Sequence, residues 1–119
     1  MNRQETKRLA RYRQKFARLQ KAVGSLGLFC QGTIWRRVIT RKPGGKAGGT
    51  KRYGPYYQWT RKVAARTVNV NLSAPRATAY AAAIRNGQQM ERLLRQMRSI
   101  SLDIINLTTP DIPRRKRLK

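Results

Sequence analysis

Residues 33–72 read TIWRRVITRKPGGKAGGTKRYGPYYQWTRKVAARTVNVNL, and they carry the clearest strand signals in the chain. Runs rich in β-branched and aromatic residues, which are typical of strands, occur at 33–40, 56–63 and 66–72. The last run alternates apolar and polar side chains, as in a sheet with one solvated face. The short Ala64-Ala65 link predicts a hairpin, so we expect a three-stranded antiparallel sheet. This link lacks the Asn-Gly signature that would define the register.

A glycine-rich basic segment, RKPGGKAGGTKR at residues 41–52, lies between the first two strand signals. Its four glycines and five cations make it too flexible and too charged to bury. Glycines also let backbone N–H groups and lysine side chains come close to phosphates. We therefore expect a long, mobile basic loop that contacts a polyanion.

Helical periodicity is present on both sides of the sheet. Residues 4–26 carry an apolar stripe at three- and four-residue spacing, which predicts a helix over 4–24. Ser73 followed by Pro75 predicts a second helix over 74–107. The first stripe consists of Leu9, Tyr12, Phe16, Leu19, Val23 and Leu26. The second consists of Tyr80, Ile84, Met90, Leu94, Met97 and Ile104, with Ile100 at its edge. The stripes can pack against the sheet, against each other or against a second copy of the chain.

Two features of the helices bear on function and packing. Opposite its apolar stripe the first helix presents Lys7, Arg11, Arg18 and Lys21, with Arg8, Arg13 and Lys15 on the flanks. A soluble helix ordinarily mixes both signs of charge, so we favour phosphate contact over plain solvation for this face. Gly87 in the second helix either weakens it by about 1 kcal/mol relative to alanine or marks the close approach of another backbone.

The 119 residues fit one domain, which we place at 1–109, followed by a basic tail at 110–119. Pro110 and Pro113 end the regular structure, and we expect the tail to be disordered until it meets an anion. The predicted fold class is α+β: a basic amphipathic helix, a three-stranded antiparallel sheet with a long basic loop, a long second helix and the tail.

The charge balance points to a polyanionic partner. The chain has 28 Lys and Arg residues against 4 Asp and Glu, a net charge of +24, and Arg exceeds Lys by about two to one. The positive charges of the chain repel one another, and a dense polyanion bound to the surface relieves this repulsion. Guanidinium groups bind phosphates and bases better than they bind a lipid surface. No signal-like or membrane-spanning run is evident, so we expect no membrane partner and a cytoplasmic or nucleoid-associated location. Cys30 is the only cysteine, which excludes an internal disulfide.

Catalytic side chains are scarce. The chain has no histidine, and Glu91 and Asp103 are too far apart on one predicted helix to act together. Gly48-Gly49-Thr50-Lys51 resembles a phosphate-binding loop only superficially, because a strand and not a helix follows it. We expect no enzymatic activity, no metal and no cofactor.

Five aromatic residues surround the basic segment, namely Trp35, Tyr53, Tyr56, Tyr57 and Trp59. Rings among cations are a stacking surface for unpaired bases. Trp59 and Tyr57 fit base stacking and the core equally well. Trp35 is predicted in the core, because large aromatic side chains are usually buried.

The order of several motifs resembles a family of small uncharacterised bacterial and archaeal proteins associated with mobile elements, known only as a domain of unknown function. The motifs lie between about residues 24 and 107: Gly24-Ser25-Leu26, Arg36-Arg37, a Gly/Lys loop, Gly54-Pro55-Tyr56-Tyr57 and Arg61-Lys62. The resemblance implies the same order of elements and a mobile-element context. Family members carry a cysteine cluster before Gly-Pro-Tyr-Tyr. This chain has Lys42-Pro43-Gly44-Gly45-Lys46 there, so that metal site would be lost.

We predict a non-catalytic protein that binds DNA or RNA largely through phosphates, as an accessory subunit of a mobile-element or other nucleoprotein complex. Two other interpretations stay open: a subunit that docks onto a nucleic-acid enzyme through its helix stripes, and a structural RNA-packing protein. The predicted contacts are Arg36, Arg37, Arg41, Lys42, Lys46, Lys51, Arg52, Tyr57, Trp59, Arg61 and Lys62 in the sheet and loop, Lys7, Arg11, Lys15 and Arg18 in the first helix, and Arg114, Arg115, Lys116 and Arg117 in the tail.

Overall fold

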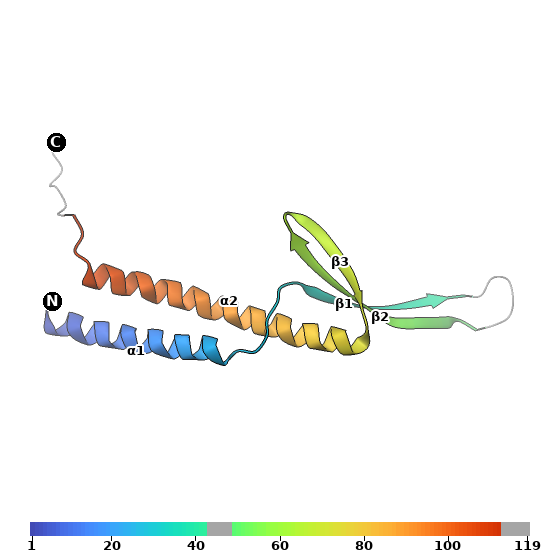
Figure 1. Cartoon of the computed structure of the whole chain (residues 1–119), viewed down its shortest axis with the longest axis horizontal. Coiled ribbons are helices and arrows are strands. Elements are labelled where there is room, and N and C mark those ends of the chain that lie inside the picture. Colours follow the sequence, from blue (N-terminus) through green and yellow to red (C-terminus); the bar gives the residue numbers. More distant parts are fainter. Residues whose placement is uncertain (43–48, 113–119) are drawn as a thin grey trace, which may run out of the picture. The chain divides into compact units, whose positions relative to one another are not determined.

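The protein has an α+β fold, as predicted. A computed structural model describes residues 1–42 and 49–112. Its elements are, in chain order, α1 (Arg3–Ser25), β1 (Thr33–Arg41), β2 (Lys51–Val63), β3 (Arg66–Leu72) and α2 (Ala74–Thr108) (Figure 1). The three strands form one antiparallel sheet. Lys46 and the predicted contacts at 114–117 lie outside the described residues.

Residues 1–109, predicted as one domain, fall into two compact units by their internal contacts. One unit comprises Met1–Leu26 and Met90–Lys119, and the other comprises Gly27–Gln89. We call them the helical unit and the sheet unit. Helix α2 contributes residues to both.

In the helical unit, α1 packs against the second half of α2. Helix α1 begins with a capping box, in which Asn2 Oδ1 accepts the Glu5 N–H at 2.8 Å and the Asn2 N–H donates to Glu5 Oε1 at 3.2 Å. The core consists of Leu19, Leu93 and Ile100, and the partly buried residues around it are Tyr12, Phe16, Ala22, Val23, Leu26, Met97 and Ile104. The two helix stripes therefore pack against each other here.

The predicted stripe of the second helix is wrong at one point. Leu93, which the prediction left out, is buried, whereas Leu94 is only partly buried. Leu93 lies nine positions after the buried Ile84, which is about two and a half helical turns. The extra half turn places Ile84 and Leu93 on opposite sides of α2. The buried positions of α2 therefore do not continue as one stripe along the whole helix.

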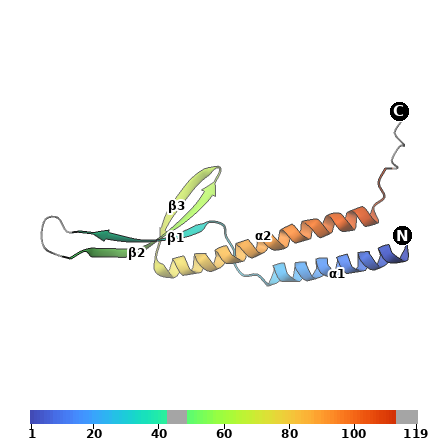
Figure 2. The same cartoon turned by 180° about the vertical axis from the view of Figure 1, so that it is seen from behind.

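In the sheet unit, β2 is the central strand and extends beyond β3. Strand β3 pairs with β2 only from Tyr57↔Leu72 to Val63↔Arg66. On the N-terminal side of Tyr57, β2 pairs with β1 alone (Figures 1 and 2). We call this two-stranded part, residues 37–41 and 51–56, the β-ribbon.

The predicted loop over 41–52 is too long at both ends. Arg41 pairs with Lys51 and Thr40 pairs with Arg52, so these cations belong to strands. The ladder of backbone hydrogen bonds continues through them because it depends on the backbone and not on the charge of the side chains.

An extra residue interrupts the ladder of the β-ribbon. Arg37 pairs with Tyr56 and Ile39 pairs with Tyr53, so two steps along β1 correspond to three along β2. The irregularity lies at Gly54, which has φ +110° and is followed by a cis peptide bond to Pro55. A Cβ on Gly54 would lie 2.9 Å from the Arg37 carbonyl oxygen, so glycine is required here both for conformation and for space.

The hairpin between β2 and β3 has an unusual turn. Ala64 and Ala65 have φ +50° and +65°, the left-handed region that a two-residue type I′ turn requires at both central positions. The turn therefore forms between Val63 and Arg66, which pair with each other, although neither central residue is glycine or asparagine.

We expect the double variant Ala64→Asn, Ala65→Gly to raise the free energy of unfolding by about 1–2 kcal/mol. Left-handed backbone costs an ordinary residue roughly 1–2 kcal/mol, and the larger conformational entropy that glycine loses on folding offsets part of the gain at the two positions. Chemical denaturation followed by circular dichroism would measure the change. Ala64→Val, which places a β-branched residue in the same conformation, should lower it. An unchanged or lower stability of the Asn-Gly variant would contradict this account of the turn.

The first half of α2 packs against one face of the sheet through an aromatic pair. The ring of Trp59 stacks on Tyr80 with centroids 4.7 Å apart, and its indole Nε1–H donates to the Gln31 carbonyl at 2.9 Å. Ile34 and Val70 share this face, because each lies directly opposite Trp59 in the register.

The segment before β1 lies against α2 at Gly87. The Cys30 N–H donates to the Ala83 carbonyl at 3.1 Å, and the Asn86 side chain donates to the Leu28 carbonyl at 2.9 Å. A Cβ on Gly87 would collide with the backbone carbonyl of Cys30. Of the two interpretations of Gly87, close approach of another backbone is confirmed.

The prediction that Trp35 belongs to the core is wrong. Trp35 is 55% exposed and lies opposite Gln58, on the face of the sheet that does not contain Trp59. Side chains alternate between the two faces of a strand, so only one of the two faces can present its aromatic residues to the helix.

Candidate nucleic-acid interface

The β-ribbon presents nearly all of its side chains to solvent. Every residue of 37–41 and 51–56 is exposed except Val38, which is partly buried. Four of these residues are cations, namely Arg37, Arg41, Lys51 and Arg52, and the exposed Lys42 directly follows. This concentration of positive charge contains no acidic residue.

Two of these cations face each other. Arg41 and Lys51 are directly opposite in the register, where Cβ atoms lie about 4.5–5.5 Å apart. Like charges in this position destabilise a strand pair, and at about 4 Å in water two unit charges repel by about 1 kcal/mol. A phosphate group between the two side chains would turn this repulsion into attraction.

One face of the β-ribbon combines rings and cations. Opposite residues share a face, so Arg37 with Tyr56, Ile39 with Tyr53, and Arg41 with Lys51 lie on the face that also carries Trp35. Two hollows adjoin on this face. Ile39 and Tyr56 line both of them, Arg37 and Gln58 line the first, and Arg41 and Tyr53 line the second. We call Trp35, Arg37, Ile39, Arg41, Tyr53 and Tyr56 the aromatic face.

On the other face of the sheet, two of the predicted contacts, Trp59 and Arg61, already contact other side chains of the protein. The Arg61 guanidinium carbon lies 4.0 Å from the centre of the Trp59 ring, and Arg61 Nη1 is buried without a hydrogen-bond partner. Trp59 stacks on Tyr80, and Tyr57 is half-buried. Lys62 is exposed, but it lies with Gln58 on the face of Trp35. Arg36 is exposed on the face of Trp59. On this side, the structure leaves Arg36 more accessible to a ligand than Trp59 or Arg61.

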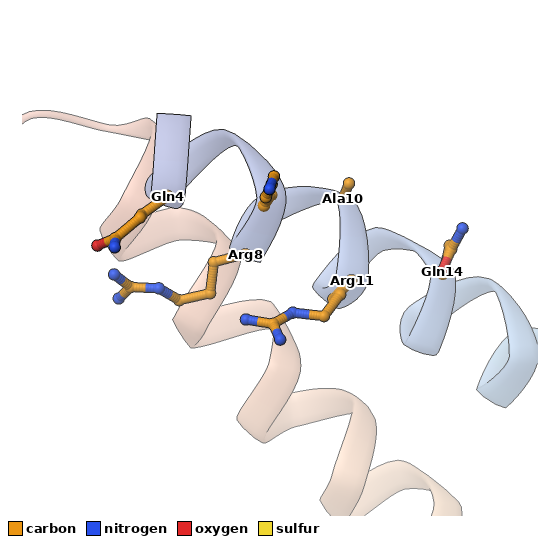
Figure 3. Close-up of a pocket in the computed structure, with 6 residues that line it drawn as sticks. Gln4, Arg8, Ala10, Arg11 and Gln14 are labelled. Atoms are coloured by element: carbon orange, nitrogen blue, oxygen red, sulfur yellow. The ribbon is translucent and has the colours of Figure 1, made fainter. Parts of the chain in front are cut away.

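Helix α1 of the helical unit carries a second basic surface. Gln4, Lys7, Arg8 and Arg11 line one hollow, and Figure 3 shows the guanidinium groups of Arg8 and Arg11 extending from α1 in the same direction. A neighbouring hollow contains Arg11, Lys15 and Arg18 from α1 together with Gln96, Ser99 and Asp103 from α2. The predicted contacts of the first helix thus line two adjoining hollows. Arg8, predicted on the flank of the cationic face but not as a contact, lines the first hollow with them.

The predicted contacts did not include four residues of the aromatic face, Trp35, Ile39, Tyr53 and Tyr56, although its three rings were noted beside the basic segment. The available signal was Gly54-Pro55, because a glycine and a proline inside a strand pattern indicate a bulge. A bulge places Tyr53 and Tyr56, three positions apart, on one face, where a regular strand would place them on opposite faces.

Within residues 1–42 and 49–112, no group of three or more His, Cys, Asp or Glu side chains is placed to hold a metal ion. In the same part of the chain, no helix is both long and apolar enough to cross a membrane.

No protein-family model, curated protein or solved structure matches this chain. The resemblance to the Gly-Pro-Tyr-Tyr family therefore stays a prediction. The features that bear on function are the charge and exposure of the β-ribbon and of α1, and the register of the β-ribbon.

Proposed function

We propose that this protein is a non-catalytic nucleic-acid-binding protein that holds its ligand mainly through phosphate groups. The observation that carries the proposal is the cross-strand pair of Arg41 and Lys51 on the exposed β-ribbon, together with Arg37 and Arg52. An arrangement that brings like charges together without an acidic neighbour is unfavourable for the protein alone and favourable once an anion lies between them.

The surface on α1 supports the same proposal. Lys7, Arg8 and Arg11 occur within five residues of one helix, and all three are exposed. Phosphates recur at short, regular intervals along a nucleic acid, so a row of cations can neutralise several of them and release their counterions. A net charge of +24 on 119 residues agrees with a ligand of this kind.

A second candidate function is that of a docking subunit for a nucleic-acid enzyme. Leu102 and Ile105 lie three residues apart on α2 and are 60% and 52% exposed, so they form a small apolar surface on the helical unit. A protein partner could cover this surface while the cations bind nucleic acid. Membership of a mobile-element complex belongs to this proposal as well.

The proposal is tested with the purified full-length chain against four probes at one salt concentration: duplex DNA, single-stranded DNA of matched sequence, structured RNA and heparin. We expect at least one nucleic acid to bind more tightly than heparin, because phosphate spacing and bases add to net charge. Equal affinity for all four probes would mean that net charge alone determines binding, and the proposal would be wrong. No binding to any probe would favour the docking-subunit function.

A further inference from the structure

The aromatic face exposes four large apolar side chains next to one another, which is unusual for a surface without a partner. Trp35, Tyr56, Tyr53 and Ile39 are 55%, 49%, 43% and 38% exposed, and the register and the shared hollows place them on one side of the β-ribbon. Single exposed apolar residues are ordinary, but a contiguous group of large ones marks an interaction site.

The bulge at Gly54 is what assembles this group. Without the extra residue in β2, Tyr53 and Tyr56 would point to opposite faces of the strand. With it, both tyrosines lie on the side of Trp35, at the cost of a regular ladder. The backbone of the β-ribbon is therefore arranged so that its rings share one face.

Cations alternate with the rings along this face. On β1 the outward residues are Trp35, Arg37, Ile39 and Arg41, with about 6.8 Å between neighbours of this series. Stacking platforms for unpaired bases have the same composition, namely rings for the bases and basic side chains that follow the backbone. In a duplex the flat faces of the bases are already stacked on each other, so exposed rings would find only base edges and phosphates there.

We infer that the aromatic face is a stacking site for the bases of single-stranded nucleic acid. The inference rests on the proposed function, since it names the kind of nucleic acid that the β-ribbon binds. Trp35 and Tyr56 are the stacking residues, and Arg37 and Arg41 hold the adjoining phosphates. Trp59 takes no part, because one face of its ring lies on Tyr80 and the Arg61 guanidinium lies over the ring.

Fluorescence quenching tests the stacking directly, because the chain has only two tryptophans, Trp35 and Trp59. The probes are an oligo-dT strand, an oligo-U strand and an abasic strand of equal length, which has the phosphates but no bases. We expect the oligo-dT and oligo-U strands to quench the wild type strongly and the Trp35→Phe variant weakly, and the abasic strand to quench neither. Equal quenching of the wild type and Trp35→Phe would overturn the inference.

Affinities provide an independent measurement. Trp35→Ala and Tyr56→Ala should each weaken binding of oligo-dT by about tenfold, as stacking on one aromatic side chain implies, and leave binding of the abasic strand unchanged. Trp35→Phe should retain most of the affinity. Phe29→Ala, which removes an aromatic side chain that is 56% exposed in the segment before β1, is the matched control and should have no effect.

The two proposals fail in different ways. If the wild type binds oligo-dT and the abasic strand equally well, and the alanine variants change neither, the stacking inference is wrong while phosphate binding stands. If the wild type binds no nucleic acid under conditions in which it is folded, the proposed function itself is wrong. If an apolar peptide or protein, and not oligo-dT, quenches Trp35, the aromatic face is a protein-docking site and the inference fails.

Discussion

Replacing the four cations of the β-ribbon by glutamine should weaken binding of single-stranded DNA by roughly a hundred- to a thousandfold near physiological salt. The variant is Arg37→Gln, Arg41→Gln, Lys51→Gln, Arg52→Gln. Each cation that neutralises a phosphate contributes about 0.7 to the slope of log affinity against log salt for a single strand. The slope should therefore become shallower by about 3, and fluorescence anisotropy over a salt series would measure both quantities.

The matched control removes the same amount of charge elsewhere. Arg76, Arg85, Arg95 and Arg98 are exposed on α2, and their replacement by glutamine lowers the net charge equally. We expect this second variant to lose far less affinity than the ribbon variant. Equal losses would mean that total charge, and not the β-ribbon, determines binding.

Gly87→Ala should lower the free energy of unfolding by about 2 kcal/mol, although alanine is the better helix former by about 1 kcal/mol. The methyl group would meet the Cys30 carbonyl, which belongs to a backbone held against α2 by the hydrogen bonds of Cys30 and Asn86. Overpacking typically costs about 1–3 kcal/mol. A collision with a fixed backbone carbonyl belongs to the upper end of that range, so about 2 kcal/mol remains after the gain of about 1 kcal/mol in helix propensity.

Gly24→Ala is the control for that experiment. Gly24 lies in α1, and a Cβ built on it has no neighbouring atom within 4 Å. The same substitution should therefore raise the free energy of unfolding by up to about 1 kcal/mol. Denaturant unfolding of both variants gives the two values, and a stabilising Gly87→Ala would contradict the close packing of the segment before β1 on α2.

The elements of this fold could be predicted from sequence because each carries a local signal. The helices predicted at 4–24 and 74–107 are observed at Arg3–Ser25 and Ala74–Thr108, and the sheet spans 33–72 as predicted. Apolar periodicity and the cap at Ser73, whose hydroxyl oxygen lies 3.4 Å from the Arg76 N–H, are properties of neighbouring residues.

What could not be predicted depends on pairing between distant residues. The side of the sheet on which Trp35 lies follows from the register, and the register follows from the Ala64-Ala65 turn and the bulge at Gly54. The turn lacks the asparagine and glycine that its geometry usually has. Gly54-Pro55 indicates a bulge but not which residues of β1 and β2 lie opposite each other. The burial of Leu93 likewise depends on α2 packing against different partners along its length.

In the candidate site, too, the residues with a local sequence signal could be predicted, and those that depend on strand pairing could not. The ribbon cations Arg37, Arg41, Lys51 and Arg52 were predicted, because a cluster of positive charge is visible in the composition of the segment. The rings at Trp35, Tyr53 and Tyr56 were not assigned as contacts, because only the bulge places them on one face. Trp59 and Tyr57, which were assigned, lie on the face with Tyr80 and Arg61.

The central claim is that the protein alone binds nucleic acid through phosphate contacts, and the salt dependence of its affinity for single-stranded DNA tests this most directly. Four contacts, from the ribbon cations Arg37, Arg41, Lys51 and Arg52, predict a straight line of log affinity against log salt with a slope of about −3 or steeper. A slope near zero, or no measurable binding by the folded protein at about 50 mM salt, would contradict the claim.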